Sequence, residues 1–265
     1  KYFFKTAKPK NEALKRDSPL AETIKLQRAK VYLGGGFGDS IPFKHGSTKE
    51  VTFGIQVPET VKRGELEIGR FEVTKAQFAQ YQTLSCTAKA GKADNSQCVE
   101  YQKIVALMQD FPESNVKLED AKAYVAWLSM LTNATWRLPY EDEVKDLYAN
   151  REGENTLDYW AGYAINPEDA TRLREKAKEI ITAARLLKEV GSFRGQGEED
   201  EEPIYDLGGN VAEWVLTRDG KGKVTGGSAD CPADPKSNCT PAPEYIGFRV
   251  VRGAPKPAPA PTAAH

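Results

Sequence analysis

The sequence predicts an α+β domain, because strand-like and helix-like patterns both occur along the chain. Apolar and polar residues alternate from Leu66 to Val73, as in a half-buried strand. Apolar residues recur with a 3.6-residue period from Leu118 to Leu131, as on one face of a helix. A third observation is the run Asn-Pro-Glu-Asp at 166–169, which is a strong helix start ahead of a further apolar stripe.

Length and composition bound the class of protein. The chain has 265 residues, enough for one large domain or two small ones with a substantial core. Its 37 basic and 38 acidic side chains leave a net charge of −1, which predicts no nucleic-acid or anionic-membrane partner. No run of eighteen apolar residues occurs, so we expect no membrane span in this chain. Because residue 1 is Lys, any signal peptide or anchor is expected upstream of it.

The N-terminal part reads as a helical lead-in followed by a strand. Residues 11–30 are polar with apolar residues at helical spacing. Val31-Tyr32-Leu33 then predicts a strand that enters a Gly-rich turn at 34–36. The phosphate-binding pattern Gly-x-x-x-x-Gly-Lys-Ser/Thr is absent, so this turn is not predicted to bind phosphate.

Two helix starts are expected in the middle of the chain. Thr74 and Gln77 have the spacing of a capping box, in which each side chain bonds to the other's backbone amide. Phe78 and Tyr81 share one face of the helix that follows. Pro139 suits the first turn of the helix after 118–131, and acidic residues follow it where the helix dipole favours them.

An amphipathic helix is predicted from about 167 to 189. Two interpretations of its stripe stay open: it covers the domain's own core, or it offers an apolar surface to a partner protein. The stripe consists of Leu173, Ala177, Ile180, Ile181, Ala184 and Leu187. The acidic run 198–202 then predicts a solvated loop, and the Pro/Ala-rich tail 253–265 predicts a mobile spacer.

The four cysteines form two near pairs, Cys86 with Cys98 and Cys231 with Cys239. Local pairing of this kind indicates two disulfide-closed loops and therefore an oxidising compartment. Closing the first loop would stabilise the fold by about 3 kcal/mol. Zinc binding and imidazole catalysis are disfavoured, because no Cys-x-x-Cys spacing occurs and the single internal histidine is His45.

Three blocks near the C-terminus resemble the formylglycine-generating enzyme family, the sulfatase-modifying factors. They are Tyr-Asp-Leu-Gly-Gly-Asn-Val-Ala-Glu-Trp at 205–214, Gly-Gly-Ser at 226–228 and Gly-Phe-Arg at 247–249. The resemblance covers about residues 30–252, leaving a lead-in at 1–29 and the tail. It implies a variant of the C-type lectin fold with a small twisted antiparallel sheet, two packed helices and much irregular structure.

The resemblance also implies a copper site. Active members hold Cu(I) between two thiolates that follow the Gly-Gly-Ser block, the second five residues after the first, and soft thiolates select this ion. Here Cys231 has the family's spacing, but Cys239 comes eight residues later, beyond two prolines. This departure favours a Cys231–Cys239 disulfide. If the site were active, Cys231, Cys239 and Ser228 would be its catalytic residues.

A calcium site is the second metal that the resemblance implies. Backbone carbonyls and a carboxylate of the Gly-Asn-x-x-Glu loop would bind Ca²⁺, a hard ion that prefers oxygen ligands. The matching residues are Gly209, Asn210, Val211 and Glu213. The alternative is a tight turn in which Asn210 and Glu213 bond to backbone while Trp214 fills the core.

Fold does not settle function. The expected function is a non-catalytic binding or scaffold module, a pseudoenzyme that contacts a protein partner. It would be periplasmic or secreted and an accessory subunit of a membrane-associated assembly. Two alternatives stay open: a copper-dependent oxidase that converts a substrate-protein cysteine to formylglycine, and a lectin-like receptor that uses the 229–246 loop.

Overall fold

The computed structural model describes residues 39–44, 50–89, 110–148, 154–180, 186–194 and 201–255. The predicted lead-in helix, the strand at 31–33, Cys98, most of the acidic run and nearly all of the tail lie outside these residues. Among the described helices, none combines the length and the apolar character that a membrane crossing requires.

The described elements mix short strands with helices, which is the predicted α+β class. In chain order they are β1 (Asp39–Lys44), β2 (Glu50–Ile55), β3 (Thr60–Arg63), β4 (Leu66–Gly69), α3 (Lys75–Lys89), α5 (Leu118–Thr132), β5 (Trp136–Arg137), α6 (Glu141–Tyr148), α7 (Leu157–Ala161), α8 (Pro167–Ile180), β6 (Ala212–Leu216), β7 (Gly222–Thr225), η2 (Pro235–Ser237), η3 (Pro243–Tyr245), β8 (Ile246–Gly247) and β9 (Val251–Arg252).

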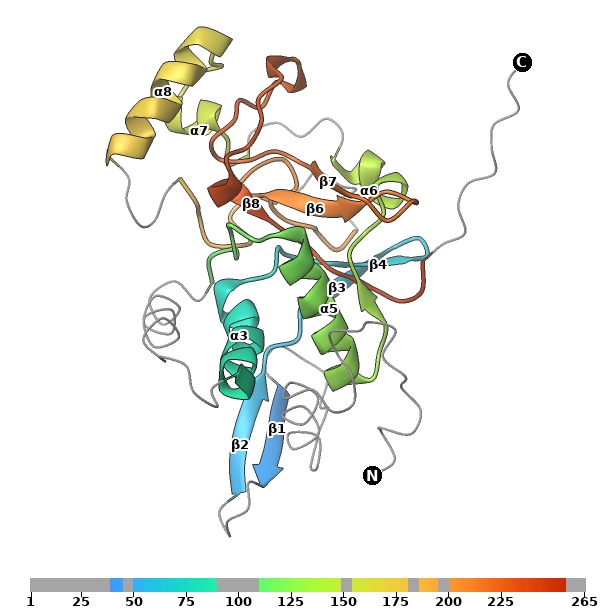
Figure 1. The fold of residues 1–265 in the computed structure, drawn as a ribbon. Coiled ribbons are helices and arrows are strands. Elements are labelled where there is room, and N and C mark those ends of the chain that lie inside the picture. Colours follow the sequence, from blue (N-terminus) through green and yellow to red (C-terminus); the bar gives the residue numbers. More distant parts are fainter. Residues whose placement is uncertain are drawn as a thin grey trace, which may run out of the picture.

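The described strands form small sheets rather than one large sheet. Strands β3, β4, β9 and β5 form an antiparallel sheet, and β7, β6 and β8 form a second in which β6 and β8 run parallel. Strands β1 and β2 form a separate hairpin that extends away from the other sheets (Figure 1). The two larger sheets share the C-terminal segment 246–252, so this segment joins them.

Helices α3 and α5 lie next to each other and enclose an aromatic core (Figure 1). Phe78 of α3 stacks on Tyr124 of α5 with ring centroids 5.6 Å apart. Phe248 contacts the same Tyr124 ring at 5.4 Å. The helical periods predicted at both places are therefore confirmed, and the Gly-Phe-Arg block is anchored in this core.

The predicted capping box is present at the start of α3. The Thr74 amide donates to Gln77 Oε1 at 3.0 Å, and the Gln77 amide donates to Thr74 Oγ1 at 3.2 Å. The preceding strand β4 ends at Gly69, four residues before the predicted end. The chain turns after Gly69, and the buried carboxylate of Glu72 accepts a hydrogen bond from Asn210, which lies in a loop far along the sequence.

Helix α6 begins at Glu141 and not at Pro139, which corrects the predicted start. Pro139 precedes the helix, and its carbonyl accepts a hydrogen bond from the Leu216 amide at 2.9 Å. Arg137 is half-buried and has a structural role. Its guanidinium forms two hydrogen bonds with Glu143, at 2.6 and 2.9 Å, and these fix the first turn of α6.

Helix α8 begins at Pro167, where the sequence predicted it. The Asp169 amide donates to Asn166 Oδ1 at 2.9 Å, which caps the helix. The predicted end at 189 is wrong, because residues 186–189 are not helical. Their backbone groups bond instead to two asparagine side chains, those of Asn155 and Asn210, so a continued helix is excluded there.

Candidate functional site

Two glycine blocks bring the candidate loops together. A Cβ atom at Gly227 would lie 1.9 Å from the Gly208 carbonyl oxygen, and one at Gly209 would lie 2.5 Å from the Asn155 carbonyl oxygen. Only glycine permits approaches this close. The loop that begins at Ser228 is therefore fixed directly beside the Gly-Asn loop.

Cys231 and Cys239, the pair predicted from the sequence, are joined by a disulfide with Cα atoms 5.7 Å apart. Cys231 is buried and Cys239 is half-buried. Ser228 lies at the start of the same loop, and its hydroxyl donates to Asp230 Oδ1 at 2.7 Å. We call residues 228–246 the disulfide loop. The second predicted pair is not described, because Cys98 and the side chain of Cys86 lie outside the described residues.

The disulfide does not fit a Cu(I) site. Copper(I) binds thiolates, and two sulfurs that are bonded to each other carry no thiolate charge. The structure therefore brings Ser228, Cys231 and Cys239 into one loop, but not in a state that binds the ion.

An arginine that the sequence did not single out holds α8 against this loop. The Nη2 atom of Arg174 donates to Asp230 Oδ2 and to the Thr240 carbonyl, both at 2.8 Å. Its Nη1 atom lies 3.3 Å from Cys239 Sγ. The contact joins residues more than fifty positions apart, and no local pattern marks it in the sequence.

The apolar stripe of α8 faces the domain's own core in the described part of the helix. Leu173 and Ala177 are half-buried and pack against a cluster that includes Leu157, Ala229 and Tyr245. These two residues are therefore at least partly used in intramolecular packing. The side chain of Ile180, together with Ile181 and Ala184, lies outside the described residues.

Asn210 is the centre of a fully buried polar network. Its Oδ1 accepts hydrogen bonds from Asn155 Nδ2 at 2.9 Å and from the Lys188 amide at 3.0 Å. Its Nδ2 donates to Glu72 Oε2 at 2.8 Å and to the Lys188 carbonyl at 3.2 Å. The second oxygen of Glu72 accepts from the Val211 amide at 3.1 Å. One side chain thus joins three segments that are distant in sequence.

Glu213 and Arg249 form a buried ion pair. Arg249 donates from Nη2 to Oε1 at 2.8 Å and from Nε to Oε2 at 3.1 Å. The remaining guanidinium hydrogens reach the carbonyls of Gly69, at 3.0 Å, and Tyr205, at 2.7 Å. The Tyr148 hydroxyl also donates to Glu213. The Gly-Asn-x-x-Glu and Gly-Phe-Arg blocks are therefore bonded to each other.

This arrangement does not fit the calcium site that the resemblance implies. The Glu213 carboxylate is taken up by Arg249, and Asn210 Oδ1 already accepts two N–H groups. The backbone carbonyl of Asn210, another ligand that the resemblance implies, accepts the Ala229 amide at 3.0 Å. Among the described residues, no group of three or more His, Cys, Asp or Glu side chains is placed to hold a metal ion.

The buried network holds an excess of acidic groups. Glu72, Asp206 and Glu213 surround the single cation of Arg249. Burial raises the pKa of Glu72 well above its ordinary value, and the charges of Asp206 and Glu213 raise it further. Burial also raises the pKa of Asp206 to about 6, although two backbone amides donate to its carboxylate. This part of the core therefore takes up protons in mildly acidic solution.

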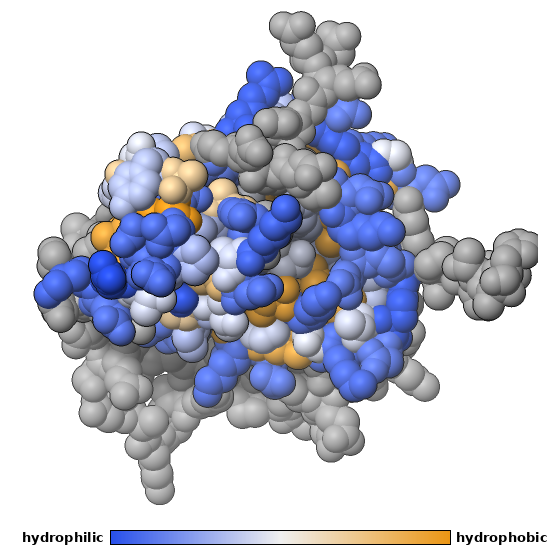
Figure 2. All heavy atoms as spheres, turned by 90° about the horizontal axis from the view of Figure 1, so that it is seen from above, coloured by the Kyte–Doolittle hydropathy of each residue, from blue (hydrophilic) through white to orange (hydrophobic). Residues whose placement is uncertain are grey.

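Three aromatic side chains are exposed around α7, next to the disulfide loop. Tyr159, Trp160 and Tyr163 are 47%, 42% and 57% exposed. Lys188 Nζ lies 5.1 Å from the Tyr159 ring centroid and 5.0 Å from that of Trp160. We call these four residues the aromatic surface. Seen from above, the described surface is mostly hydrophilic, with smaller pale and orange areas between the blue residues (Figure 2).

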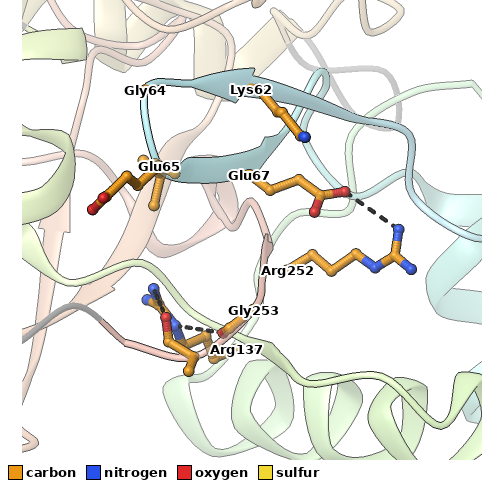
Figure 3. A pocket seen from close by; sticks show the side chains of 9 residues that line it. Lys62, Gly64, Glu65, Glu67, Arg137, Arg252 and Gly253 are labelled. Carbon is orange, nitrogen blue, oxygen red and sulfur yellow. Dashed lines mark hydrogen bonds and ion pairs between the residues drawn. The ribbon is translucent and has the colours of Figure 1, made fainter.

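A separate pocket of about 260 Å³ opens between the β3–β4 turn and the end of β9 (Figure 3). Both of its arginines and Glu67 are engaged in contacts of their own. Arg252 pairs with Glu67 at 3.3 Å, and Arg137 Nε donates to the Gly253 carbonyl at 3.1 Å. The pocket shares no lining residue with the disulfide loop or the Asn210 network.

Helices packed on small, mainly antiparallel sheets, with loops fixed by paired glycine blocks, define an α+β domain of the formylglycine-generating type. The chain matches the sulfatase-modifying factor enzyme 1-like domain over residues 15–254, and it belongs to that family. Among solved structures it is similar to PvdO from Pseudomonas aeruginosa, with 17% sequence identity and a TM-score of 0.41. That likeness covers 82% of this chain and 92% of that one. No curated protein matches the chain significantly.

Proposed function

We propose that this chain is a non-catalytic binding or scaffold domain, an extracytoplasmic accessory subunit of a membrane-associated assembly. The observation that carries the proposal is the Cys231–Cys239 disulfide. While its two candidate sulfurs are bonded to each other, as they are in this oxidised state, a family member has no thiolate pair with which to bind Cu(I) and a substrate sulfur.

The aromatic surface supports a binding role. Tyrosine and tryptophan dominate the energetics of protein interfaces, because they bury much apolar area and keep a polar edge. Trp160 and Tyr163 lie within one short stretch, beside a loop that the disulfide makes rigid. We infer that a protein partner contacts this side of the domain. The disulfide also favours an oxidising compartment outside the cytoplasm.

Thiol and copper measurements test the non-catalytic part of the proposal. The protein as isolated, without reductant, is expected to expose no thiol at 231 or 239 to Ellman's reagent. It is also expected not to compete with bicinchoninate for Cu(I). Two reactive thiols at these positions, together with tight Cu(I) binding, would instead favour the copper-dependent oxidase.

Purification from the native source tests the binding part. The tagged full-length protein, cross-linked before extraction, is compared with the double variant Trp160→Ala/Tyr163→Ala. Recovery of a partner held by the aromatic surface is expected to fall by well over tenfold in the variant, because aromatic anchors at interfaces contribute about 2 kcal/mol or more each and two are removed. Lys221→Ala, an exposed residue on the β6–β7 turn, is the control. Equal recovery of the same partner with both proteins contradicts the proposal.

A further inference from the structure

We propose that the Cys231–Cys239 disulfide and Arg174 form a reducible latch that holds α8 on the domain. In the oxidised protein the latch is closed and α8 covers an apolar cluster. Reduction by a dithiol opens the disulfide loop, and α8 is released.

The latch depends on where the contacts of Arg174 lie. Arg174 donates to the carboxylate of Asp230 and to the backbone carbonyl of Thr240. Asp230 directly precedes Cys231, and Thr240 directly follows Cys239. The two acceptors are ten positions apart in sequence. The disulfide brings them together, because it holds the Cα atoms of the neighbouring cysteines 5.7 Å apart. The guanidinium therefore binds a pair of oxygens whose spacing the disulfide sets.

The helix side of the latch is lightly packed. Ala170 is buried, whereas Leu173 and Ala177 are only half-buried against the cluster beneath. Figure 1 shows α8 at the edge of the molecule, beyond the two larger sheets. The half-buried contacts of Leu173 and Ala177 stabilise docking less than full burial would, so we expect the loss of Arg174's contacts to weaken the docking of α8. Release of α8 uncovers Tyr245 and its apolar neighbours.

The chemistry of opening follows from exposure. Cys231 is 5% exposed and Cys239 is half-buried, so an incoming thiolate reaches Cys239 first. Its sulfur bonds to Cys239 Sγ, and Cys231 leaves as a thiolate that takes up a proton from water. The second thiol of the reductant, once deprotonated, then attacks the reductant sulfur that is bonded to Cys239 Sγ, and Cys239 leaves as a thiolate. Two electrons pass from the dithiol, which becomes a disulfide, to the cysteine pair.

Arg174 acts on this equilibrium through docking more than through its charge. A lone guanidinium beside Cys239 would stabilise a thiolate and so favour reduction. Here its charge is shared with the Asp230 carboxylate at 2.8 Å, which offsets that effect. The docked helix then protects the disulfide. Because coupling between two equilibria is reciprocal, α8 docking stabilises the disulfide by the same factor by which the disulfide stabilises α8 docking.

Hydrogen exchange on the full chain tests the forward direction. Amide exchange of α8, residues 167–180, is measured by mass spectrometry before and after reduction with dithiothreitol. We expect exchange of α8 to rise about tenfold on reduction, within the usual range of such couplings. Amides of α5, residues 118–132, are expected not to change. Unchanged α8 exchange overturns the latch, and so does an equal rise in α5, which would make the disulfide a brace of the whole fold.

Redox titration tests the reverse direction. The fraction of reduced Cys231 and Cys239 is read by alkylation and peptide mass spectrometry, which separates them from the other two cysteines. The proteins are equilibrated in mixtures of reduced and oxidised dithiothreitol. The ratio of reduced to oxidised dithiothreitol at which half of the disulfide is reduced is expected to be about tenfold lower for Arg174→Gln than for the wild type. Arg172→Gln is the matched control, since Arg172 is exposed on the same helix. Identical midpoints for Arg174→Gln and Arg172→Gln, or a higher ratio for Arg174→Gln, reject the proposal.

Discussion

Replacing Arg249 with methionine tests whether the buried ion pair is the main polar support of the domain. The substitution keeps most of the side-chain volume and removes the charge. It leaves Glu213 buried without a cation, and it leaves the carbonyls of Gly69 and Tyr205 without their donors. Glu72 also loses the positive charge that holds down its pKa.

The magnitude follows from these losses. Removing one partner of a buried ion pair destabilises by about 3–5 kcal/mol. Each carbonyl left without a donor costs about 1–3 kcal/mol, although water that enters the site recovers part of this. We therefore expect Arg249→Met to lower the free energy of unfolding by about 5 kcal/mol, which is comparable to the whole stability of many domains.

The assay is urea unfolding of the oxidised protein at pH 7, followed by tryptophan fluorescence. Arg252→Met is the control, because Arg252 lies on the adjoining strand in an exposed pair with Glu67 and is expected to cost less than about 1 kcal/mol. Glu213→Gln and the double variant complete a cycle, with an expected coupling of about 1–3 kcal/mol. An Arg249→Met loss no larger than that of Arg252→Met, or strictly additive effects, would refute the reasoning.

Further predictions concern the turns, the protonation of the core and metal dependence. Gly227→Ala is expected to cost about 3 kcal/mol or more in urea unfolding, because its Cβ would lie 1.9 Å from backbone. Gly220→Ala, where space is open and φ is +83°, is expected to cost about 1–2 kcal/mol; equal losses contradict this account. Thr74→Ala is expected to cost about 1 kcal/mol through the lost cap, and an unchanged urea midpoint would show that the cap does not contribute. Burial raises the pKa of Asp206 from 3.8 to about 6, so the folded state binds this proton more tightly than the unfolded state. The stability that this proton binding contributes is therefore greatest below about pH 4, and about 3 kcal/mol of it is lost as the pH rises through 6. Asp206→Asn is expected to lack this slope, and parallel stability curves of the two proteins would contradict it. Finally, the melting temperature of wild type and Glu213→Gln is expected to differ by the same amount in millimolar calcium and in EDTA; a difference that appears only with calcium would restore the metal site.

Local patterns predicted the helices well, because a helix is decided within a few residues of sequence. The 3.6-residue period placed α5, and the spacing of Thr74 and Gln77 gave the cap of α3. The Cys231–Cys239 disulfide was also predictable, since the two cysteines are near each other in the chain. In each case the interacting groups lie within one or two turns or a short loop.

The long-range polar contacts could not be predicted in the same way. Nothing near Glu72 in the sequence indicates that its carboxylate bonds to Asn210, 138 positions later. A carboxylate after a Gly-Asn turn suits a calcium ion and a distant arginine equally, so the sequence left the partner of Glu213 undecided. The packing of the chain places Arg249 there. The extent of α8 was overestimated for a related reason, because the asparagine side chains that interrupt the helical pattern come from other segments.

The blocks that identify the family therefore divide into two kinds. The Gly-Asn-x-x-Glu and Gly-Phe-Arg blocks bond to each other through Glu213 and Arg249, Asn210 bonds to Glu72 near the start of α3, and these contacts fix the frame. Each of these side chains bonds to another member of the set or to nearby backbone. The block that would carry catalysis follows Gly227. In this block the spacing of the cysteines departs from that of active family members, the two cysteines form a disulfide, and Asp230 binds Arg174 of α8. The ion pair bonds to Gly69, Tyr148 and Tyr205, whereas the disulfide loop joins the frame through the Ala229 amide, which donates to the Asn210 carbonyl at 3.0 Å. A loop attached in this way can take on another role while the ion pair is kept. The function of this protein should accordingly be sought in the disulfide loop, α8 and the aromatic surface beside them.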